Sequence, residues 1–274
     1  MSKSVWMNEL TWEEVAEYLE KDDIVLVPVG STEQHGPAGP LGLDTYAAIA
    51  LAEDVAQKAG VLSTPPLWFG DSAHHLGFAG TISLSTETLA AVVKDICRSL
   101  ARHGFRRILI INGHKSSNLP ALLSATRYLH EHELPHVLFA VVDPMYLARG
   151  IAARVKETFE HHAGELEISH VWYRFPHLIH PERIPAASVP LEQVLSGFCT
   201  RDLLGPNGDT IEVVWNSGEQ KAFAPTGAFS DASKASPEKG KAYHDYMVDR
   251  LVEFISWIRT YGGPVGSAGK RTEV

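Results

Sequence analysis

The chain has 274 residues, of which 45% are hydrophobic and 21% are charged, and its formal net charge is −9 at pH 7. This composition is typical of a globular protein with a large core, and the acidic balance disfavours nucleic acid or an anionic membrane as a partner, because both attract basic surfaces. No stretch reaches the ~20 apolar residues of a membrane span. The N-terminal residues lack the apolar run of a signal peptide, and Cys97 and Cys199 are isolated thiols, so we expect a cytoplasmic protein.

Segments with helical and β-strand patterns alternate along the chain. The first helix is predicted over 11–20, where Thr11 and Glu14 have the spacing of a capping box. Further helices are predicted over 45–60 and 86–105 and from residue 119 onward, and strands over 24–30, 61–69, 106–113 and 136–143. This alternation predicts one α/β domain over 1–274, with helices on both faces of a mostly parallel sheet.

Residues 176–231 interrupt the alternation. They are rich in Pro and Gly, and we expect an irregular segment that contains a short strand over 211–215. A last helix follows, with Ser236 as its N-cap and Pro237 at its first position. The tail, residues 262–274, is expected to fray.

The first candidate site follows the strand over 24–30. Glu33, His35 and Asp44 lie in one Gly- and Pro-rich loop, and fourteen histidines in the chain make a metal site worth seeking. One imidazole and two carboxylates suit a divalent cation such as Zn or Mn. The alternative is a polar loop in which Asp44 serves only as the N-cap of the next helix.

A second loop leaves the strand over 106–113 with the residues Asn112, Gly113 and His114. Because the carboxyl ends of parallel strands meet at one edge of the sheet, this loop and the loop over 31–44 are expected to converge. Taken alone, His114 is better explained as a solvated loop histidine. Convergence of the two loops favours a metal ligand.

Two further segments contain paired histidines. The segment over 161–167, HHAGELE, offers imidazoles and carboxylates for a ligand and for proton transfer, or else marks a helix N-terminus whose acidic residues favour the helix dipole. The segment over 72–81 contains His74 and His75 among glycines, and we interpret it as a pocket wall rather than a ligand set.

Four ordered motifs, VPVGSTEQHGPAGPLGLD, HHLGFAGTISLSTETL, IINGHKSSN and HHAGELEIS, resemble those of the creatininase family of amidohydrolases. The resemblance covers roughly residues 8–170 and, more loosely, the GAFSDASKASPEKG segment. It implies a three-layer α/β/α sandwich, hydrolysis of a small amide, two divalent metal ions (Zn, Mn or Fe) per chain, and a homo-oligomer, commonly a hexamer.

The resemblance also implies a set of ligands. It places Glu33 and His114 on one metal and His35 on the other, with Asp44 bridging the two, Glu165 as a further ligand, and His162 in proton transfer. The pattern of creatininase itself has a glutamate where this chain has Ser116, and Glu165 is the expected replacement, with Glu167 as the second choice or a supporting residue. Side chains expected to support the ligands or line the pocket are Glu167, His75, Asn112 and Ser116.

The predicted reaction is cleavage of a C–N bond, in a cyclic amide, by a water that the two metals activate. His162 is expected to protonate the departing nitrogen. Creatinine itself is disfavoured as the substrate, because the chain has no tryptophan just before the His-Ala-Gly motif. The alternatives are a deformylase or metallopeptidase with the same centre, and a non-catalytic protein that binds a metal or a ligand.

Overall fold

The computed structural model describes residues 4–184 and 214–262. Its centre is a four-stranded sheet in the order β2-β1-β3-β4, in which every pair of neighbouring strands is parallel. The strands are β1 (Ile24–Val29), β2 (Leu62–Ser63), β3 (Arg107–Asn112) and β4 (Leu138–Val142). Each of these strands lies within one of the four segments for which the apolar, β-branched sequence predicted a strand.

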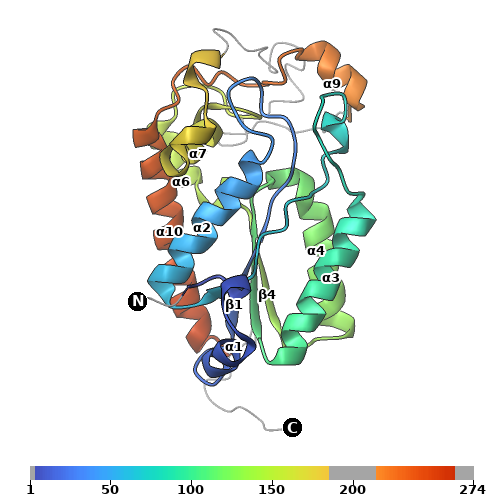
Figure 1. Cartoon of the computed structure of the whole chain (residues 1–274), viewed down its shortest axis with the longest axis vertical. Helices are drawn as coiled ribbons and strands as arrows, with labels where there is room; N and C mark the ends of the chain where they lie inside the picture. Colours follow the sequence, from blue (N-terminus) through green and yellow to red (C-terminus); the bar gives the residue numbers. More distant parts are fainter. Residues whose placement is uncertain (1–3, 185–213, 263–274) are drawn as a thin grey trace.

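The register of the sheet places the ends of β1 and β3 level with each other. Val29 is paired with Asn112, the last residues of the two strands. The loops that follow these strands therefore leave the same edge of the sheet, at the upper end in Figure 1. This confirms that the loop after β1 and His114 converge.

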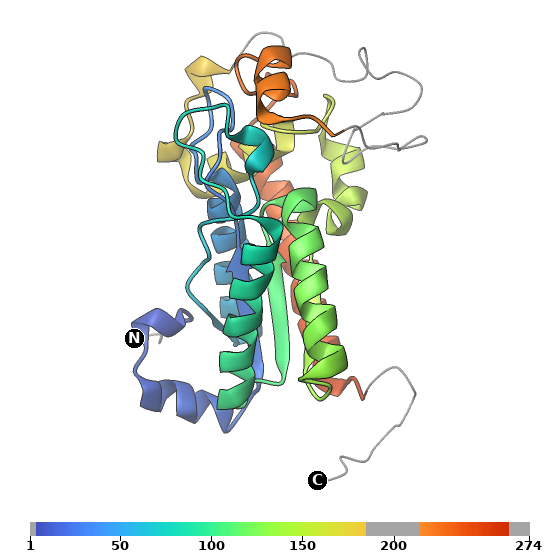
Figure 2. The same ribbon diagram turned by 90° about the vertical axis from the view of Figure 1, so that its right-hand side faces the viewer.

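Helices cover both faces of the sheet. One layer contains α2, α6, α7 and α10, and the other contains α3 and α4; Figure 2 shows α3 and α4 side by side, with α10 behind the sheet. The helices are α1 (Trp12–Leu19), α2 (Leu43–Ala59), α3 (Thr86–His103), α4 (Lys115–His132), α5 (Pro144–Leu147), α6 (Arg149–Val155), α7 (Glu165–Arg174), α9 (Ser217–Phe223) and α10 (Pro237–Thr260), and the short 3-10 turns are η1 (Met7–Glu9), η2 (Ala73–His75), η3 (Pro176–Leu178) and η4 (Pro181–Arg183).

Alternate residues of β1 pack against the two helical layers. Ile24 and Leu26 pack with the residues of α2 and α10, whereas Val25 and Val27 pack with those of α3 and α4. All six residues of β1 are buried, because side chains of a strand point alternately to opposite faces and both faces are covered. The predicted three-layer α/β/α sandwich is confirmed.

Several predicted helix ends are also confirmed. Thr11 and Glu14 form the capping box at α1, and the side chain of Ser236 accepts a hydrogen bond from the backbone of Lys239 at the start of α10. The helix expected from residue 119 onward begins four residues earlier, because α4 starts at Lys115, so the prediction that residues 115–118 belong to a loop was wrong. The side chain of Asn118 contacts two other loops: it donates to the Gly30 carbonyl and accepts from the Asp71 N–H, both at 3.0 Å.

The segment over 176–231 is only partly described. It contains η3 and η4, and it contains α9, which the sequence analysis missed although Asn216 and Glu219 form a capping box there. The strand expected over 211–215 lies mostly outside the described residues, and Val214 and Trp215 belong to no strand. Cys199 and nearly all of the tail also lie outside them.

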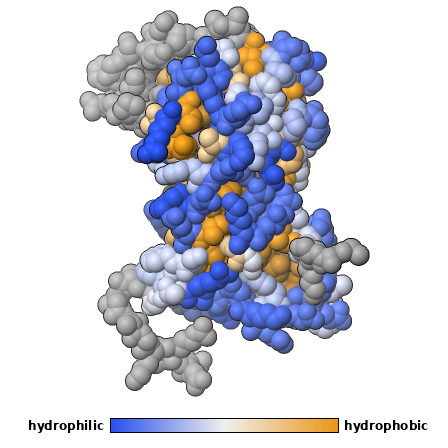
Figure 3. Space-filling model, turned by 90° about the vertical axis from the view of Figure 1, so that its left-hand side faces the viewer, coloured by the Kyte–Doolittle hydropathy of each residue, from blue (hydrophilic) through white to orange (hydrophobic). Residues whose placement is uncertain are grey.

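The described helices include none that is both long and apolar enough to cross a membrane. Figure 3 shows the side on which α10 lies in Figure 1, and this face is mostly hydrophilic with separate hydrophobic areas. One exposed aromatic side chain of α10 is Trp257, which is 51% exposed.

Candidate metal centre

The loop after β1 folds back on itself and brings Asp44 beside His35. The Glu33 N–H donates to the Leu41 carbonyl at 2.8 Å, and the Gly39 N–H donates to the His35 carbonyl at 3.2 Å. Asp44 therefore returns in the first turn of α2, with its Oδ1 atom 3.2 Å from Nε2 of His35. Gly42, not Asp44, is the N-cap of α2, so the alternative role of Asp44 as a cap is wrong.

The loop after β3 reaches the same carboxylate from the other side. A Cβ atom at Gly113 would lie 2.0 Å from the backbone oxygen of Asp44, so only glycine permits this approach. Nδ1 of His114 lies 2.8 Å from Oδ2 of Asp44, and its Nε2 lies 3.1 Å from Oε2 of Glu33. Each oxygen of Asp44 thus faces an imidazole from a different loop. Asn112 supports this loop by accepting a hydrogen bond from the His114 N–H at 3.1 Å.

The segment before α7 adds His162, which is buried. Its Nδ1 lies 3.7 Å from Oε1 of Glu33, and its Nε2 lies 2.8 Å from the Gln34 carbonyl oxygen. Glu33, His35 and His162 each have one ligand-type atom within 4.8 Å of the others. The structure therefore places His162 where it can act either in proton transfer or as a ligand.

The two carboxylates of α7 have different surroundings. Oε2 of Glu165 accepts hydrogen bonds from the backbone N–H groups of Glu157 and Thr158 and from the Thr158 hydroxyl, and its Oε1 pairs with Lys239. Glu167 is also held by a backbone N–H, that of Ala163 at 2.6 Å, and by a lysine, Lys115. Unlike Glu165, it forms a group with His35 and Asp44 in which the ligand atoms lie within 4.8 Å of one another. The geometry thus favours Glu167, the second choice of the sequence analysis, over Glu165.

Two residues near the centre were missed or underrated from sequence. Gln34 had no assigned role, yet its Nε2 lies 3.0 Å from Nδ1 of His75 and 2.9 Å from Nε2 of His162, so it orients both rings. The sequence could have indicated this role, because Gln34 lies between the predicted ligands Glu33 and His35. His74 was interpreted as pocket wall, but it forms a third candidate group with Glu33 and His114.

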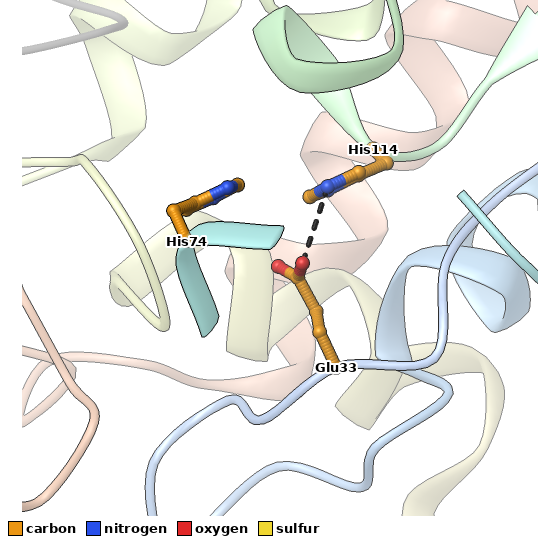
Figure 4. Close-up of side chains that lie close together, drawn as sticks. All are labelled: Glu33, His74 and His114. Carbon is orange, nitrogen blue, oxygen red and sulfur yellow. Dashed lines mark ion pairs between the residues drawn. The ribbon is translucent and has the colours of Figure 1, made fainter. Parts of the chain in front are cut away.

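Figure 4 shows this third group. The side chains of His74 and His114 point toward each other across a gap, and the carboxylate of Glu33 lies beside that gap. The two rings are parallel, with centroids 6.1 Å apart. Ser116, the remaining predicted residue, is exposed on the first turn of α4.

Unsatisfied polar atoms test whether the site fits a metal. Both carboxylate oxygens of Glu33 and Nε2 of His35 are buried. Among the described residues their close polar neighbours are ion-pair partners, imidazoles for Glu33 and the Asp44 carboxylate for His35, and none of the three atoms makes a hydrogen bond of ordinary geometry. Buried polar atoms nearly always have a hydrogen-bonding partner. The lone pairs of these atoms are therefore suited to bind a metal ion. Carboxylates and imidazoles without thiolates fit Zn, Mn or Fe. The residues present therefore fit the divalent ions that the sequence predicted.

The electrostatics of the cluster agree with this fit. Burial opposes charge on His35 and His114, but the neighbouring Asp44 and Glu33 outweigh it and raise their pKa values to about 9 and about 10. Burial also opposes charge on Asp44, but those two imidazoles hold its pKa well below the usual range. Burial raises the pKa of Glu33 to about 7. A divalent cation would take over the role of the imidazole protons among these carboxylates.

The pKa values of the other histidines near the centre, His74, His75 and His162, are lowered instead of raised. Burial and the neighbouring imidazoles lower the pKa of His75 and hold that of His162 well below the ordinary value. Burial likewise lowers the pKa of His74 to about 4. These rings are neutral at pH 7, the form in which an imidazole binds a metal or accepts a proton.

A parallel α/β sandwich with a buried cluster of carboxylates and imidazoles at the carboxyl edge of its sheet has the construction of a metal-dependent hydrolase. The comparison with known families agrees: the family model for creatininase, described as creatinine amidohydrolase, matches residues 8–255. The chain belongs to the creatininase family, and it is a hydrolase of that family.

Three relatives are similar over most of their length. Creatinine amidohydrolase of Pseudomonas putida is 32% identical, covering 93% of this chain and 97% of the relative. 3-dehydro-scyllo-inosose hydrolase of Thermotoga maritima is 26% identical (92% and 82% covered), and a mycofactocin precursor peptide peptidase of Mycobacterium ulcerans is 31% identical (88% and 87% covered). Among solved structures, a mutant creatininase of Zn-Zn type is 28% identical, with a TM-score of 0.74, covering 94% of this chain and 99% of that chain.

Proposed function

We propose that the protein is a metal-dependent amidohydrolase that cleaves a C–N bond of a small, cyclic amide with a water activated at two divalent metal ions. The observation that carries this proposal is the position of Asp44, whose two oxygens lie 3.2 Å from His35 and 2.8 Å from His114. A carboxylate with ligand groups on both oxygens is suited to bridge two cations. The Zn-Zn type of the creatininase neighbour supports two ions of this kind.

The three candidate metal groups suggest which residues would bind each of the two ions. Glu33 and His114, with His74 beside them, would hold one ion, and His35 and Glu167 would hold the other, with Asp44 shared. Bound divalent ions would supply an activated water and polarise the substrate carbonyl. Glu165 is left out, because among the described residues it belongs to none of the candidate metal groups.

His162 is the proposed proton-transfer residue. Its ring is buried and neutral, it lies against Glu33, and Gln34 and the packing of His75 at a centroid distance of 4.3 Å hold it in place. A neutral imidazole accepts a proton from the attacking water and delivers it to the departing nitrogen. Replacement of His162 by Asn should lower kcat while leaving the metal content unchanged; loss of metal instead would make His162 a ligand.

The alternative substrate is a short modified peptide. A relative that is 31% identical is named as a peptide peptidase, whereas others are named for creatinine and for 3-dehydro-scyllo-inosose, so the family accommodates different substrates. The same centre would serve either reaction, because the chemistry requires only a polarised carbonyl and an activated water. Cyclic amides, ureas, formamides and short peptides assayed side by side would separate the two proposals.

Elemental analysis of the wild-type protein tests the centre directly. About two equivalents of metal per chain, together with hydrolysis of one of the compounds above, would support the proposal. Metal without any turnover would favour the non-catalytic metal-binding alternative, and a protein that binds no divalent ion at all would overturn the proposal.

The predicted homo-oligomer, a hexamer by resemblance, stays a proposal. Large apolar side chains are exposed on the loops around the centre, among them Leu41, Phe69, Leu76 and Ile82. Contacts between copies of the chain would cover such residues. Light scattering on the purified protein would give the number of chains. A cytoplasmic location is likewise still a prediction, which fractionation of cells would test.

A further inference from the structure

Residues 227–231 come from a distant part of the chain and lie along the turn that carries His162. Three hydrogen bonds join the two segments: the Phe229 N–H donates to the His162 carbonyl at 3.1 Å, the His161 N–H donates to the Ser230 hydroxyl at 2.6 Å, and the Thr158 hydroxyl donates to the Asp231 carbonyl at 2.7 Å. The two segments therefore run antiparallel, and the backbone of His162 is fixed by the segment that leads into α10.

Gly227 allows the same segment to reach Gln34. Its φ is 85°, and a Cβ atom there would lie 1.8 Å from Oε1 of Gln34, so only glycine permits this approach. The Gly227 carbonyl accepts a hydrogen bond from Nε2 of Gln34 at 3.0 Å, while Oε1 of Gln34 accepts one from the Gly36 N–H at 2.9 Å. Both ends of the Gln34 amide are thus fixed, and this amide lies beside His75 and His162.

The side chain of Phe229 packs on the same two histidines. Its ring centroid lies 6.3 Å from that of His75 and 6.1 Å from that of His162, with interplanar angles of 69° and 76°. The two imidazoles are stacked on each other with centroids 4.3 Å apart, and Phe229 is buried. Aromatic rings favour such edge-to-face contacts, and a close-packed ring leaves its neighbours little room to turn. Phe229 therefore restricts the rotation of both imidazoles.

Phe223 of α9 belongs to the same aromatic cluster but has other neighbours. Its ring lies 6.1 Å from that of Phe229 and 4.9 Å from that of Trp215. Within the part of the chain that the structure describes, these two rings are its aromatic contacts. The cluster thus joins α9 to the centre, and Phe229 is the member whose ring meets the histidines of the centre.

We propose that Phe229 is a positioning residue: its ring holds the stacked imidazoles of His75 and His162 and keeps His162 directed at the centre. This inference rests on the proposed function, in which His162 transfers a proton. Nδ1 of His162 lies 3.7 Å from Oε1 of Glu33, so a rotation of the imidazole would move this atom away from the reacting groups. A misplacement of about 1 Å can lower a rate about a hundredfold. Phe229 has no ligand atom and is 3% exposed, so metal and substrate binding should change little.

The first test needs no substrate and uses diethyl pyrocarbonate, a reagent that acylates accessible neutral imidazoles. In the full-length wild type, the buried rings of His75 and His162 should react slowly. In Phe229→Leu their acylation rates, measured by mass spectrometry of the digested protein, should rise about fivefold or more, because the rings leave their buried positions more often. In Phe223→Leu, the matched control, both rates should equal those of the wild type. Phe229→Met fills a similar volume without a ring and replaces Phe229→Leu should that variant fail to fold.

The second test separates kcat from KM in the Zn²⁺-loaded protein, with the compound that the assays above show to be hydrolysed. Phe229→Leu should lower kcat about tenfold or more, with KM within about threefold and the metal content unchanged, whereas Phe223→Leu should keep kcat and KM within about threefold. Equal acylation rates or equal kcat values in the two leucine variants, or a raised KM with an unchanged kcat in Phe229→Leu, would overturn the inference. A wild type that hydrolyses none of the compounds would instead contradict the proposed function, and the acylation rates would still decide whether Phe229 holds the histidines.

Discussion

The two sides of the candidate centre are built differently. On one side, Glu33, His35, Asp44 and His114 follow the ends of β1 and β3, whose register fixes where each loop starts. On the other side, His162 and Glu167 come from the strained turn over 160–164 and the first turn of α7. Side chains that leave a parallel sheet are positioned by main-chain pairing, whereas those on α7 depend on tertiary contacts. Changes on the strand side should therefore abolish metal binding, whereas changes on the α7 side should reduce the occupancy of the second metal.

The largest effect should follow a change on the strand side. Replacement of Asp44 by Ala removes the carboxylate shared by His35 and His114, so both metals lose a ligand. Loss of a residue that merely supports a ligand costs about 10–100-fold, so we expect activity to fall by more than about a hundredfold. Elemental analysis of the variant and the wild type, prepared together, should show the metal content collapse. An Asp44→Ala protein that retains two equivalents would contradict the bridging role.

A paired substitution on α7 should sharpen the comparison. Glu167→Gln is expected to reduce occupancy of the second metal, with the first retained, because Glu167 belongs to the group with His35 and Asp44. Glu165→Gln should leave both metals bound. It should instead lower the free energy of unfolding by about 1–3 kcal/mol, since a buried carboxylate with several donors is disturbed.

Metal analysis and urea unfolding on the two α7 variants measure these outcomes. The reverse pattern, with metal lost from Glu165→Gln and retained in Glu167→Gln, would restore the assignment that the motif alone suggested.

This difference explains what the sequence could predict. The order of strands and helices follows from apolar periodicity and from the caps at Thr11 and Ser236, and the strand-end ligands follow from the geometry of parallel sheets. The choice between Glu165 and Glu167 could not be made in the same way. It depends on how the turn before α7 bends at Ala163, with φ of 53°, and on which donors of a distant segment reach each carboxylate.

The role of His74 illustrates the same limit. Its pattern, paired histidines among glycines, indicated a pocket wall, because nothing local shows that η2 packs against the loop after β3. The contact arises through Asp71, whose backbone carbonyl lies 2.9 Å from Nε2 of His114. Long-range pairing of two loops, rather than local propensity, places His74 opposite His114.

A smaller effect is expected from replacing His74. The ring completes the group with Glu33 and His114 and has no hydrogen-bonding partner among the described residues, so His74→Ala should raise the Kd of the first metal about tenfold without a loss of stability. His132→Ala, on the exposed end of α4, is the matched control. Competition with a chromophoric chelator measures the Kd. An unchanged Kd with an altered KM would mean that His74 contacts the substrate instead.

The smallest effect is a pH dependence that contrasts metal-free and metal-loaded protein. In the metal-free protein, His35 and His114 have pKa values raised to about 9 and about 10, and Glu33 a value raised to about 7. A raised folded-state pKa means that the folded protein holds the proton more tightly than the unfolded chain. The imidazole contribution to stability is therefore complete below the unfolded value near 6.5 and is lost as the pH rises through about 9 to 10.

Metal removal should therefore lower the free energy of unfolding and also change how steeply it depends on pH. With chelator present, the free energy of unfolding should decline steadily between pH 7 and pH 10, whereas with saturating Zn²⁺ it should be flatter, because the metal replaces those protons and binds more tightly as they leave. Urea denaturation at several pH values measures both slopes. Zinc binding at pH 7 should also release protons, which calorimetry in buffers of different ionisation enthalpy would detect. Parallel slopes without proton release would mean that the buried imidazoles of the strand side do not bind the metal.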